Sequence, residues 1–374
     1  MSDSTGRVAF VHDWLTGMRG GEKVLEELLD IAPEAPIYTL FHFDGTVSEA
    51  IESHPIVPSY LQHAPAVKQH YRRYLPMFPR AIERFDLSEF DLVVSTSHCV
   101  AKGVLNGPST YHLCYCHTPM RYIWDQETAY FPKRTGPVAR LRGRLLGNLR
   151  RWDVASADRV DQFVANSSFV AWRIETYYDR NALVVHPPVD VDFFNPADGS
   201  ERRPFCLAVS ALAPYKRVDM AIEACARADI ELRVVGDGPE RPRLERLAEG
   251  TKTHLLGRVS AEELQRLYRT ATCFLQPAVE DFGIATVEAL ASGLPVVATG
   301  AGGVLDIVED GVHGVLTEGE PDAAKLTAAI DKSRRIGFNE SVLRAKSEQF
   351  STARFREQMR SILGDRPSDL KGLR

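Results

Sequence analysis

Short apolar runs that alternate with polar, glycine-bearing loops and amphipathic stretches recur along the whole chain and constrain its fold most. Bounded by polar residues, such runs predict strands of parallel sheets buried on both faces. They occupy residues 7–12, 37–41, 91–95, 111–117, 162–166 and 182–186, then 205–209, 231–235, 254–256, 272–277 and 296–299. Strands that alternate with helices in this way favour a doubly wound α/β architecture.

A proline- and charge-rich stretch separates the strand-bearing segments into two groups. The 374 residues suffice for two domains, each with its own core. We predict a first domain over residues 1–195, a linker over 196–204, a second domain over 205–348 and a C-terminal helix over 349–374. Phe355, Met359 and Leu363 share one side of that helix, which either packs on the first domain, as we expect, or ends on the surface.

Composition narrows the classes of function. A net charge of −5 gives no case for nucleic acid binding. Six cysteines scattered through a chain of this size fit reduced thiols in the cytosol better than a disulfide framework. The start is polar and runs straight into a strand, and no apolar run approaches the roughly eighteen residues of a spanning helix. We therefore expect a cytoplasmic protein whose contact with a membrane is at most peripheral.

Glycine and serine residues follow two strands of the first half. Gly17, Gly20 and Gly21 lie between the first strand and a helix, in a loop that either receives an anion or makes a tight turn. The spacing is not that of the dinucleotide-binding fingerprint. After the third strand, the stretch from Ser95 to His98 predicts the cap of another helix.

Two groups of residues resemble metal sites, and we favour another role for each. His112, Cys114 and Cys116 share one face of a strand, but no second ligand cluster accompanies them, which favours buried thiols over zinc. Asp190 and Asp192 resemble a metal–diphosphate motif inside a proline-bearing segment, where turn or hinge residues are expected instead. We thus predict no metal site.

Two segments of the first half combine basic with apolar residues. Residues 68–85 interleave basic and aromatic side chains, as in a solvated helical hairpin or a surface for an anionic or lipid-bearing partner. The stretch from Lys133 to Arg151 carries seven basic residues, no acidic one, and leucines at helical spacing. Such a helix either lies on an anionic membrane, which we favour, or packs on its domain with solvated arginines.

In the second half, one edge of the predicted sheet collects glycines and cations. Lys216 and Arg217 follow the first strand of this half, and adjacent cations in a strand-to-helix loop fit a diphosphate. Loops with glycines follow the later strands and allow a ligand to approach the backbone closely. Ligands of open α/β sheets bind at this carboxyl edge.

Two carboxylates flank a glycine where a strand gives way to a helix. Glu280 lies in the loop, Gly283 precedes the helix, and Glu288 lies about a turn and a half into it. The unpaired N–H groups of the helix start suit a phosphate. The two glutamates either bind the hydroxyls of a ligand, or are simply a solvated loop residue and an exposed helix residue. The cations of the neighbouring loop favour the first interpretation.

The order of these motifs resembles glycosyltransferase family 4, the retaining, nucleotide-sugar-dependent transferases of the GT-B fold. The resemblance covers nearly the whole chain and rests on a short set of motifs, namely Gly17 with Gly20-Gly21, Cys116-His117-Thr118-Pro119, Lys216, Gly236-Asp237-Gly238-Pro239 and Glu280 with Glu288. The stretches Val11-His12-Asp13-Trp14 and residues 115–125 are similar to bacterial mannosyltransferases of O-antigen and exopolysaccharide assembly. The fold this implies is two Rossmann-like domains facing each other across a cleft.

The resemblance also implies roles for single residues. Glu288 would hold the ribose hydroxyls and Glu280 the sugar hydroxyls. Lys216 and the backbone N–H groups of Gly283 and Ile284 would bind the diphosphate. The resemblance also implies that Gly238 and Arg258 contact the base and ribose and that His117 contacts the donor sugar. It places Gly20 and Gly21 at the sugar or phosphate. Many relatives have an arginine where this chain has Ala211, and we expect Arg217 to supply that charge.

These roles predict a retaining hexosyltransferase. The donor would be a nucleotide sugar, GDP-mannose rather than a UDP-sugar, and the acceptor a lipid-linked saccharide. No metal or other cofactor is expected, since fixed cations and helix starts stabilise the leaving diphosphate. The rival functions are a nucleotide-sugar epimerase or phosphorylase on a similar fold, and a catalytically silent sugar-binding subunit.

Overall fold

The computed structural model describes residues 7–124, 137–196 and 202–364 and divides into two compact units. The first unit comprises Met1–Pro187 and Phe355–Arg374, and the second comprises Pro188–Arg354. Residues 188–195, which we assigned to the first domain from sequence, belong to the second unit because Val189 and Phe194 are buried in its core. Residues 197–201 of the predicted linker lie outside the described residues.

The first unit is built on a parallel sheet with the strand order β3-β2-β1-β4-β5-β6-β7. The strands are β1 (Val8–His12), β2 (Ile37–Thr39), β3 (Ile56–Pro58), β4 (Leu92–Ser97), β5 (Tyr111–Cys116), β6 (Gln162–Ala165) and β7 (Ala182–Val184). The edge strand β3 escaped prediction because it is short and its residues are largely exposed, so it lacks an apolar run.

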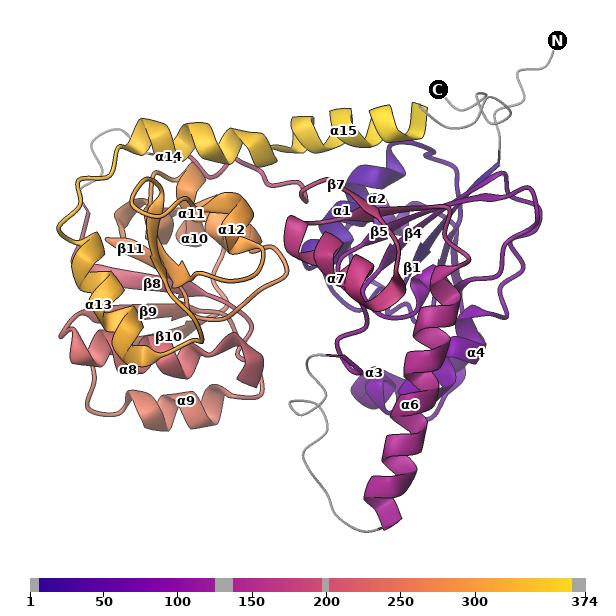
Figure 1. Ribbon diagram of the computed structural model, residues 1–374, viewed down its shortest axis with the longest axis horizontal. Helices are drawn as coiled ribbons and strands as arrows, with labels where there is room; N and C mark the ends of the chain where they lie inside the picture. The colour runs from indigo at the N-terminus through magenta and orange to yellow at the C-terminus, as the bar shows by residue number, and fades with distance from the viewer. Residues whose placement is uncertain (1–6, 125–136, 197–201, 365–374) are drawn as a thin grey trace. The chain divides into compact units, whose positions relative to one another are not determined.

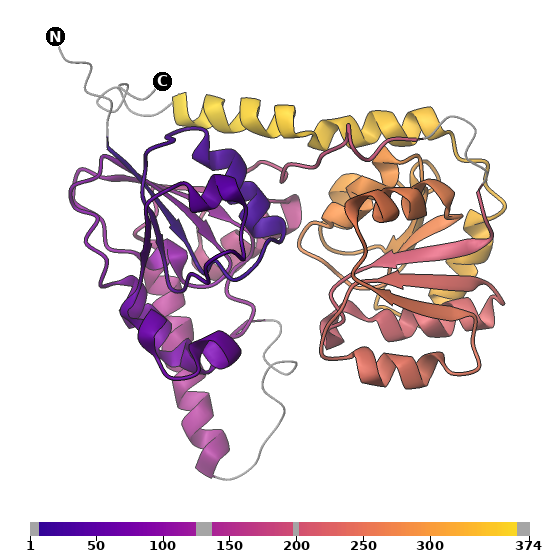
Figure 2. The same ribbon diagram turned by 180° about the vertical axis from the view of Figure 1, so that it is seen from behind.

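Helices cover both faces of this sheet (Figures 1 and 2). They are α1 (Gly20–Leu29), α2 (Glu49–Glu52), α3 (Val67–His70), α4 (Phe78–Ile82), α6 (Pro137–Ala157) and α7 (Ser168–Tyr178). Alternate residues of β1 enter different cores, with Phe10 in one and Val11 in the other. Burial on both sides explains why the strands read as continuous apolar runs.

The C-terminal helix α15 (Thr352–Gly364) returns to the first unit, as predicted. Phe355, Met359 and Leu363 are buried in the same core as Phe10. Arg356 adds ion pairs to α1, through Glu27 and, at 3.2 Å, through Asp30. The remaining residues of the predicted helix, 365–374, lie outside the described residues.

Two predicted helical segments of the first unit differ from expectation. No α-helix follows Ser95–His98; a turn leads instead into the short 3₁₀ helix η3 (Ala101–Gly103), because a buried carboxylate binds the N–H groups of this turn. Residues 67–82 form the short helices α3 and α4 joined by a 3₁₀ helix that contains Pro76, whereas a helical hairpin was one of the two interpretations of residues 68–85.

The second unit is a parallel sheet with the order β10-β9-β8-β11-β12-β13. Its strands are β8 (Phe205–Val209), β9 (Glu231–Val235), β10 (Thr253–Gly257), β11 (Cys273–Gln276), β12 (Val296–Thr299) and β13 (Gly314–Thr317). Its helices are α8 (Val218–Arg227), α9 (Arg241–Ala248), α10 (Ala261–Thr270), α11 (Ile284–Ala291), α12 (Val304–Ile307), α13 (Ala323–Ser333) and α14 (Glu340–Ser347). Figure 1 shows them on both faces of the sheet.

Strand order locates a crevice in each unit. The order of the chain reverses between β1 and β4 in the first sheet and between β8 and β11 in the second. At such a switch point the two loops leave in opposite directions, which opens a space at the carboxyl edge where ligands bind in doubly wound folds. The loops of interest are therefore those after β1, β4, β8 and β11.

Candidate functional site

Lys216 and Glu280 meet at the crevice of the second unit. Lys216 ends the 3₁₀ turn after β8, and Glu280 lies in the loop after β11. Nζ of Lys216 is 2.8 Å from Oε2 of Glu280, and both side chains are partly exposed. The structure thus joins two residues that are 64 positions apart and that we had placed at one sheet edge.

A glycine-rich loop fixes the backbone of Glu280. The N–H of Gly303, in the loop after β12, donates to the Glu280 carbonyl at 2.8 Å. Gly302 has a φ of +83°, and a Cβ there would lie 2.4 Å from the same carbonyl oxygen. Only glycine permits this approach, so the loop positions Glu280 through its main chain.

The start of α11 lies directly after Glu280. Gly283 has a φ of +113°, and a Cβ at this position would lie 2.8 Å from Oε1 of Gln276. Gln276 is buried at the end of β11 and accepts a hydrogen bond from Thr286 in the first turn of α11. The glycine therefore lets the chain turn sharply over the buried amide, and the first N–H groups of α11, including that of Ile284, begin at the carboxyl edge.

Glu288 is held by a tyrosine that sequence reasoning missed. The hydroxyl of Tyr268, in α10, donates to Oε2 of Glu288 at 2.9 Å. Burial, followed by the Glu288 charge, raises the pKa of Tyr268 well above its usual value, so the phenol stays protonated and remains a donor. Glu288 itself is 7% exposed. No motif signals this contact, because Tyr268 sits on an ordinary helix face.

The other predicted residues of the second unit occupy neighbouring loops. Nε of Arg217 is 3.2 Å from Oδ1 of Asp219, so its charge is paired with a residue of the first turn of α8. Gly238 follows β9 at the same edge, where a Cβ would lie 2.5 Å from the carbonyl oxygen of Leu212. Arg258 follows β10 and is exposed.

In the first unit, Gly20, Gly21 and His117 lie at the carboxyl edge. Gly20 and Gly21 open α1, and a Cβ on Gly21 would be 3.5 Å from Nε2 of His117. Burial, followed by the nearby His98, lowers the pKa of His117 well below its usual value, so its ring is neutral at pH 7. Arg173 donates to the hydroxyl of the adjoining Thr118 at 2.7 Å and steadies this loop.

Three residues near His117 were not predicted as site residues. His12 ends β1 and lies 2.6 Å from the Thr96 hydroxyl through its Nδ1, while Asp13 and His98 pair on the neighbouring loops. The sequence placed these residues at or just beyond the ends of predicted strands, and His12 and Asp13 within the stretch similar to bacterial mannosyltransferases, but it gave none of them a role.

The suspected metal residues have other partners. His112 is buried, with its Nε2 2.7 Å from the Ser95 hydroxyl and its Nδ1 3.0 Å from the Arg159 carbonyl oxygen. Asp190 accepts the N–H of Phe193 in a turn, and Asp192 lies 3.4 Å from Arg344. Within residues 7–124, 137–196 and 202–364, no group of three or more His, Cys, Asp or Glu side chains is arranged to hold a metal ion.

The basic segment forms much of α6, which projects from the first unit in Figure 1. Leu146 and Leu149 are buried in the core, whereas Leu141 is 67% exposed. Arg140 and Arg144 are exposed as well. The stripe of leucines on α6 thus divides into a packed part and an exposed part. Lys133 and Arg134, the first two basic residues of the segment, lie outside the described residues.

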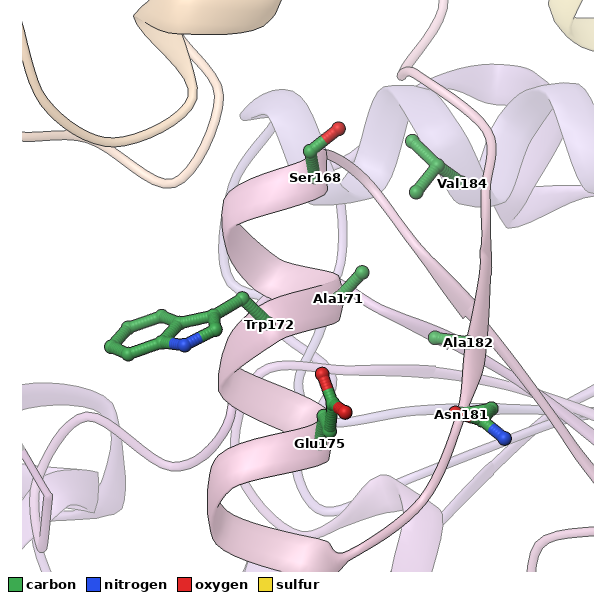
Figure 3. A pocket seen from close by; sticks show the side chains of 7 residues that line it. All are labelled: Ser168, Ala171, Trp172, Glu175, Asn181, Ala182 and Val184. Carbon is green, nitrogen blue, oxygen red and sulfur yellow. The ribbon is translucent and has the colours of Figure 1, made fainter.

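A shallow pocket lies away from these residues, between α7 and β7. Figure 3 shows Glu175 and Val184 on its walls, with the indole of Trp172 pointing away from it. None of the predicted site residues lines it.

Two doubly wound parallel-sheet units in one chain agree with the GT-B fold of glycosyltransferases. The chain is similar to glycosyltransferases along most of its length, through two family models that each match less than half of it. The family model described as Glycosyltransferase Family 4 matches residues 20–193, and the model described as Glycosyl transferases group 1 matches residues 192–336. The predicted family and fold class are thereby confirmed.

Individual relatives match in part. A D-inositol 3-phosphate glycosyltransferase of Geodermatophilus obscurus is 38% identical over 220 residues, which cover 50% of this chain and 48% of that protein. A GDP-mannose-dependent alpha-(1-6)-phosphatidylinositol monomannoside mannosyltransferase of Mycolicibacterium smegmatis is 34% identical over 223 residues, or 52% and 56% of the two chains. The chain therefore spans about half the length of the curated relatives it matches.

Solved structures match over nearly the full length. Alr3699/HepE of Anabaena, in complex with UDP and glucose, aligns with 96% of this chain and 100% of its own, with a TM-score of 0.69 and 19% identity. Sucrose-phosphate synthase of Thermosynechococcus elongatus gives a TM-score of 0.70 at 17% identity, with 96% and 98% covered. At such identities the likeness establishes the fold alone.

Among the helices of the described ranges, none combines the length and the apolar character needed to cross a membrane.

Proposed function

We propose that the protein is a retaining glycosyltransferase that moves a hexose from a nucleotide sugar to a hydroxyl of a lipid-linked saccharide, in the synthesis of a cell-surface polysaccharide. The observation that carries this proposal is the Lys216–Glu280 pair at the crevice between β8 and β11. A sugar diphosphate requires a cation and a helix start for its phosphates and a carboxylate for its hydroxyls. Here all three lie within one short stretch of the sheet edge.

Each group has a part in the proposed reaction. Departure of the nucleoside diphosphate leaves negative charge on its phosphate, and Lys216 with the N–H groups of Gly283 and Ile284 stabilises that charge where it develops. Glu280 orients the sugar, and Glu288, fixed by Tyr268, binds the ribose hydroxyls. The acceptor oxygen attacks the anomeric carbon on the same face from which the diphosphate leaves, and the donor phosphate takes the acceptor proton. Attack from that face retains the anomeric configuration.

We favour GDP-mannose as the donor. The partial match to a GDP-mannose-dependent mannosyltransferase supports this choice, while a protein of similar fold binds UDP and glucose. Both nucleotides therefore belong in any test. Cytoplasmic placement with peripheral binding to an anionic membrane is part of the proposal, supported by the exposed basic and apolar residues of α6.

The experiment is a thermal-shift screen of GDP-mannose and a panel of UDP-sugars, followed by transfer assays with lipid-linked saccharides. A ligand bound only by the native state raises the unfolding midpoint. We expect one nucleotide sugar to stabilise the protein and Lys216→Ala to abolish that shift. The matched variant Arg217→Ala tests whether the second cation adds to binding.

Other outcomes point to other functions. Turnover without an acceptor, or with phosphate alone, would indicate an epimerase or a phosphorylase. Binding without any turnover would indicate a silent sugar-binding subunit. If no nucleotide sugar stabilises the wild-type protein, the proposal fails.

A further inference from the structure

Three neighbouring strands of the first unit deliver histidines to one sheet edge. β1 ends at His12, His98 follows β4, and His117 follows β5. Because these strands are parallel and adjacent, the rings gather at the carboxyl edge, where the His98 ring centroid is 6.2 Å from that of His12 and 6.3 Å from that of His117. His98 and Asp13 lie on the two loops that border the switch point of this sheet.

The carboxylate of Asp13 organises the turn that carries His98. It is fully buried and accepts four backbone hydrogen bonds. The donors are the N–H groups of His98 (2.6 Å), Cys99 (2.9 Å), Val100 (2.6 Å) and Ala101 (2.8 Å). Such a set of charge-assisted bonds holds the turn in one conformation.

The same carboxylate decides which ring nitrogen of His98 carries the hydrogen. Nδ1 of His98 is 3.1 Å from Oδ2 of Asp13. A carboxylate oxygen this near repels the lone pair of a bare Nδ1, so the contact favours the tautomer that carries its hydrogen on Nδ1 and leaves the lone pair on Nε2. Burial lowers the pKa of His98 in spite of Asp13, which keeps the ring neutral at pH 7.

His98 remains within reach of a ligand. Its side chain is 27% exposed, whereas that of Asp13 is not exposed. The Trp14 indole packs perpendicular to the imidazole, with ring centroids 4.4 Å apart at 87°, and restrains its tilt. Within residues 7–124, 137–196 and 202–364 no side chain or backbone group hydrogen-bonds Nε2 of His98.

We propose that Nε2 of His98 accepts a hydrogen bond from a hydroxyl of the acceptor saccharide, with Asp13 as the positioning residue that fixes its tautomer. This inference rests on the proposed glycosyltransferase function. A neutral ring that offers only an acceptor atom selects a group that donates, as a sugar hydroxyl does, and disfavours an anionic oxygen. His98 is thus a determinant of acceptor binding.

The kinetic test uses the full chain, the donor identified in the nucleotide-sugar screen and octyl α-D-mannopyranoside as the acceptor probe. We expect His98→Phe to raise the acceptor KM about tenfold or more, because one hydrogen bond in the site is lost. Donor affinity measured by calorimetry should stay within about twofold of the wild-type value. His98→Gln, whose amide oxygen also accepts, should recover part of the loss, and His63→Phe, at an exposed histidine of the same unit, is the control.

A spectroscopic test isolates the role of Asp13. Nitrogen-15 spectra of the histidine rings should show the Nδ1–H tautomer for His98 in the wild-type protein. In Asp13→Asn two of the four backbone N–H groups lose their acceptor and the amide nitrogen can donate to Nδ1, so we expect a larger share of the Nε2–H tautomer and weaker acceptor binding. Tryptophan fluorescence reports whether this variant keeps its fold, because Trp14, Trp124, Trp152 and Trp172 all belong to the first unit.

The two proposals fail in different ways. A wild-type protein that binds no nucleotide sugar overturns the proposed function. If it binds one, an Nε2–H tautomer at His98, or an acceptor KM that is unchanged in His98→Phe, overturns the role of His98. If octyl mannoside is not glycosylated, the nitrogen-15 resonance of His98 Nε2 is followed while the saccharide is titrated in. A resonance that does not move also overturns the role of His98.

Discussion

At the scale of single residues, Lys216 and Glu280 neutralise each other across the β8–β11 crevice. A phosphate and a carboxylate compete for the same ammonium group, whereas a sugar diphosphate satisfies both residues. In the proposed reaction we therefore expect the pair to favour the complete donor over the free nucleotide. Arg217, engaged by Asp219, does not take part in this contact.

Removal of the Glu280 charge should separate these effects. We expect Glu280→Gln to bind the free nucleoside diphosphate roughly two- to tenfold more tightly, because Lys216 loses a partly exposed partner. Turnover should fall at the same time, since the sugar loses its carboxylate. Calorimetry and initial rates measure the two quantities, and tighter product binding combined with unchanged turnover would contradict the role given to Glu280.

At the scale of elements, the glycine-rich loop after β12 supports the loop after β11 through main-chain contacts. Both Gly302 and Gly311 have a φ near +80°. A Cβ on Gly302 would collide with the Glu280 carbonyl oxygen, whereas a Cβ on Gly311 would meet no atom within 4 Å. Alanine substitutions at the two positions therefore separate the energetic cost of the positive φ from that of the steric collision.

Alanine at these two positions should therefore have unequal effects. Gly311→Ala should lower the free energy of unfolding of the second unit by about 1 kcal/mol, the cost of the left-handed conformation. Gly302→Ala should lower it by about 2–4 kcal/mol, because the collision displaces the loop as well. Urea unfolding followed by circular dichroism measures the difference, and equal effects would show that the loop contact contributes nothing.

The exposed half of α6 makes the membrane proposal testable. We expect Arg140→Glu combined with Arg144→Glu to weaken binding to phosphatidylglycerol vesicles roughly tenfold or more, since each basic residue near an anionic surface contributes about 1 kcal/mol. Arg246→Glu with Arg335→Glu makes the same charge change on exposed residues of the second unit. Co-sedimentation that falls equally in both double variants would argue against a specific role for α6.

At the scale of the whole molecule, the sequence predicted both sheets because burial on two faces leaves apolar runs in the strands. Strands such as β9 and β12 have the bounds expected for them, and the proximity of Lys216 to Glu280 followed from parallel strands ending at one edge. Long-range contacts escaped prediction. The four bonds of Asp13 span more than 80 positions, and the Tyr268–Glu288 bond joins two helices, so neither leaves a periodic pattern.

Buried histidines couple the stability of the first unit to pH. Burial lowers the pKa of His112 to about 4, whereas an unfolded histidine titrates near 6.5. The unfolded state therefore takes up more protons as the pH falls, and stability present above pH 6.5 is lost progressively towards pH 4, by roughly 3 kcal/mol for this group. The pKa values of His98 and His117 shift in the same direction.

Tryptophan fluorescence during urea unfolding at pH 7, 6, 5 and 4 measures this loss in the first unit. His112→Asn should unfold with a shallower dependence on pH over this range, because one titrating group is gone. A wild-type stability that stays level between pH 6.5 and 4 would contradict the burial of these rings.

The most direct test of the central claim, that the crevice of the second unit binds a nucleotide sugar, is a calorimetric comparison of the wild-type protein with Glu288→Ala. We expect one donor to bind per chain and its affinity to fall about tenfold or more in the variant, because the ribose loses a buried, tyrosine-held carboxylate. Glu288→Gln, which keeps an acceptor for Tyr268, controls for loss of packing and should bind with intermediate affinity. Equal affinities in all three proteins would contradict the account.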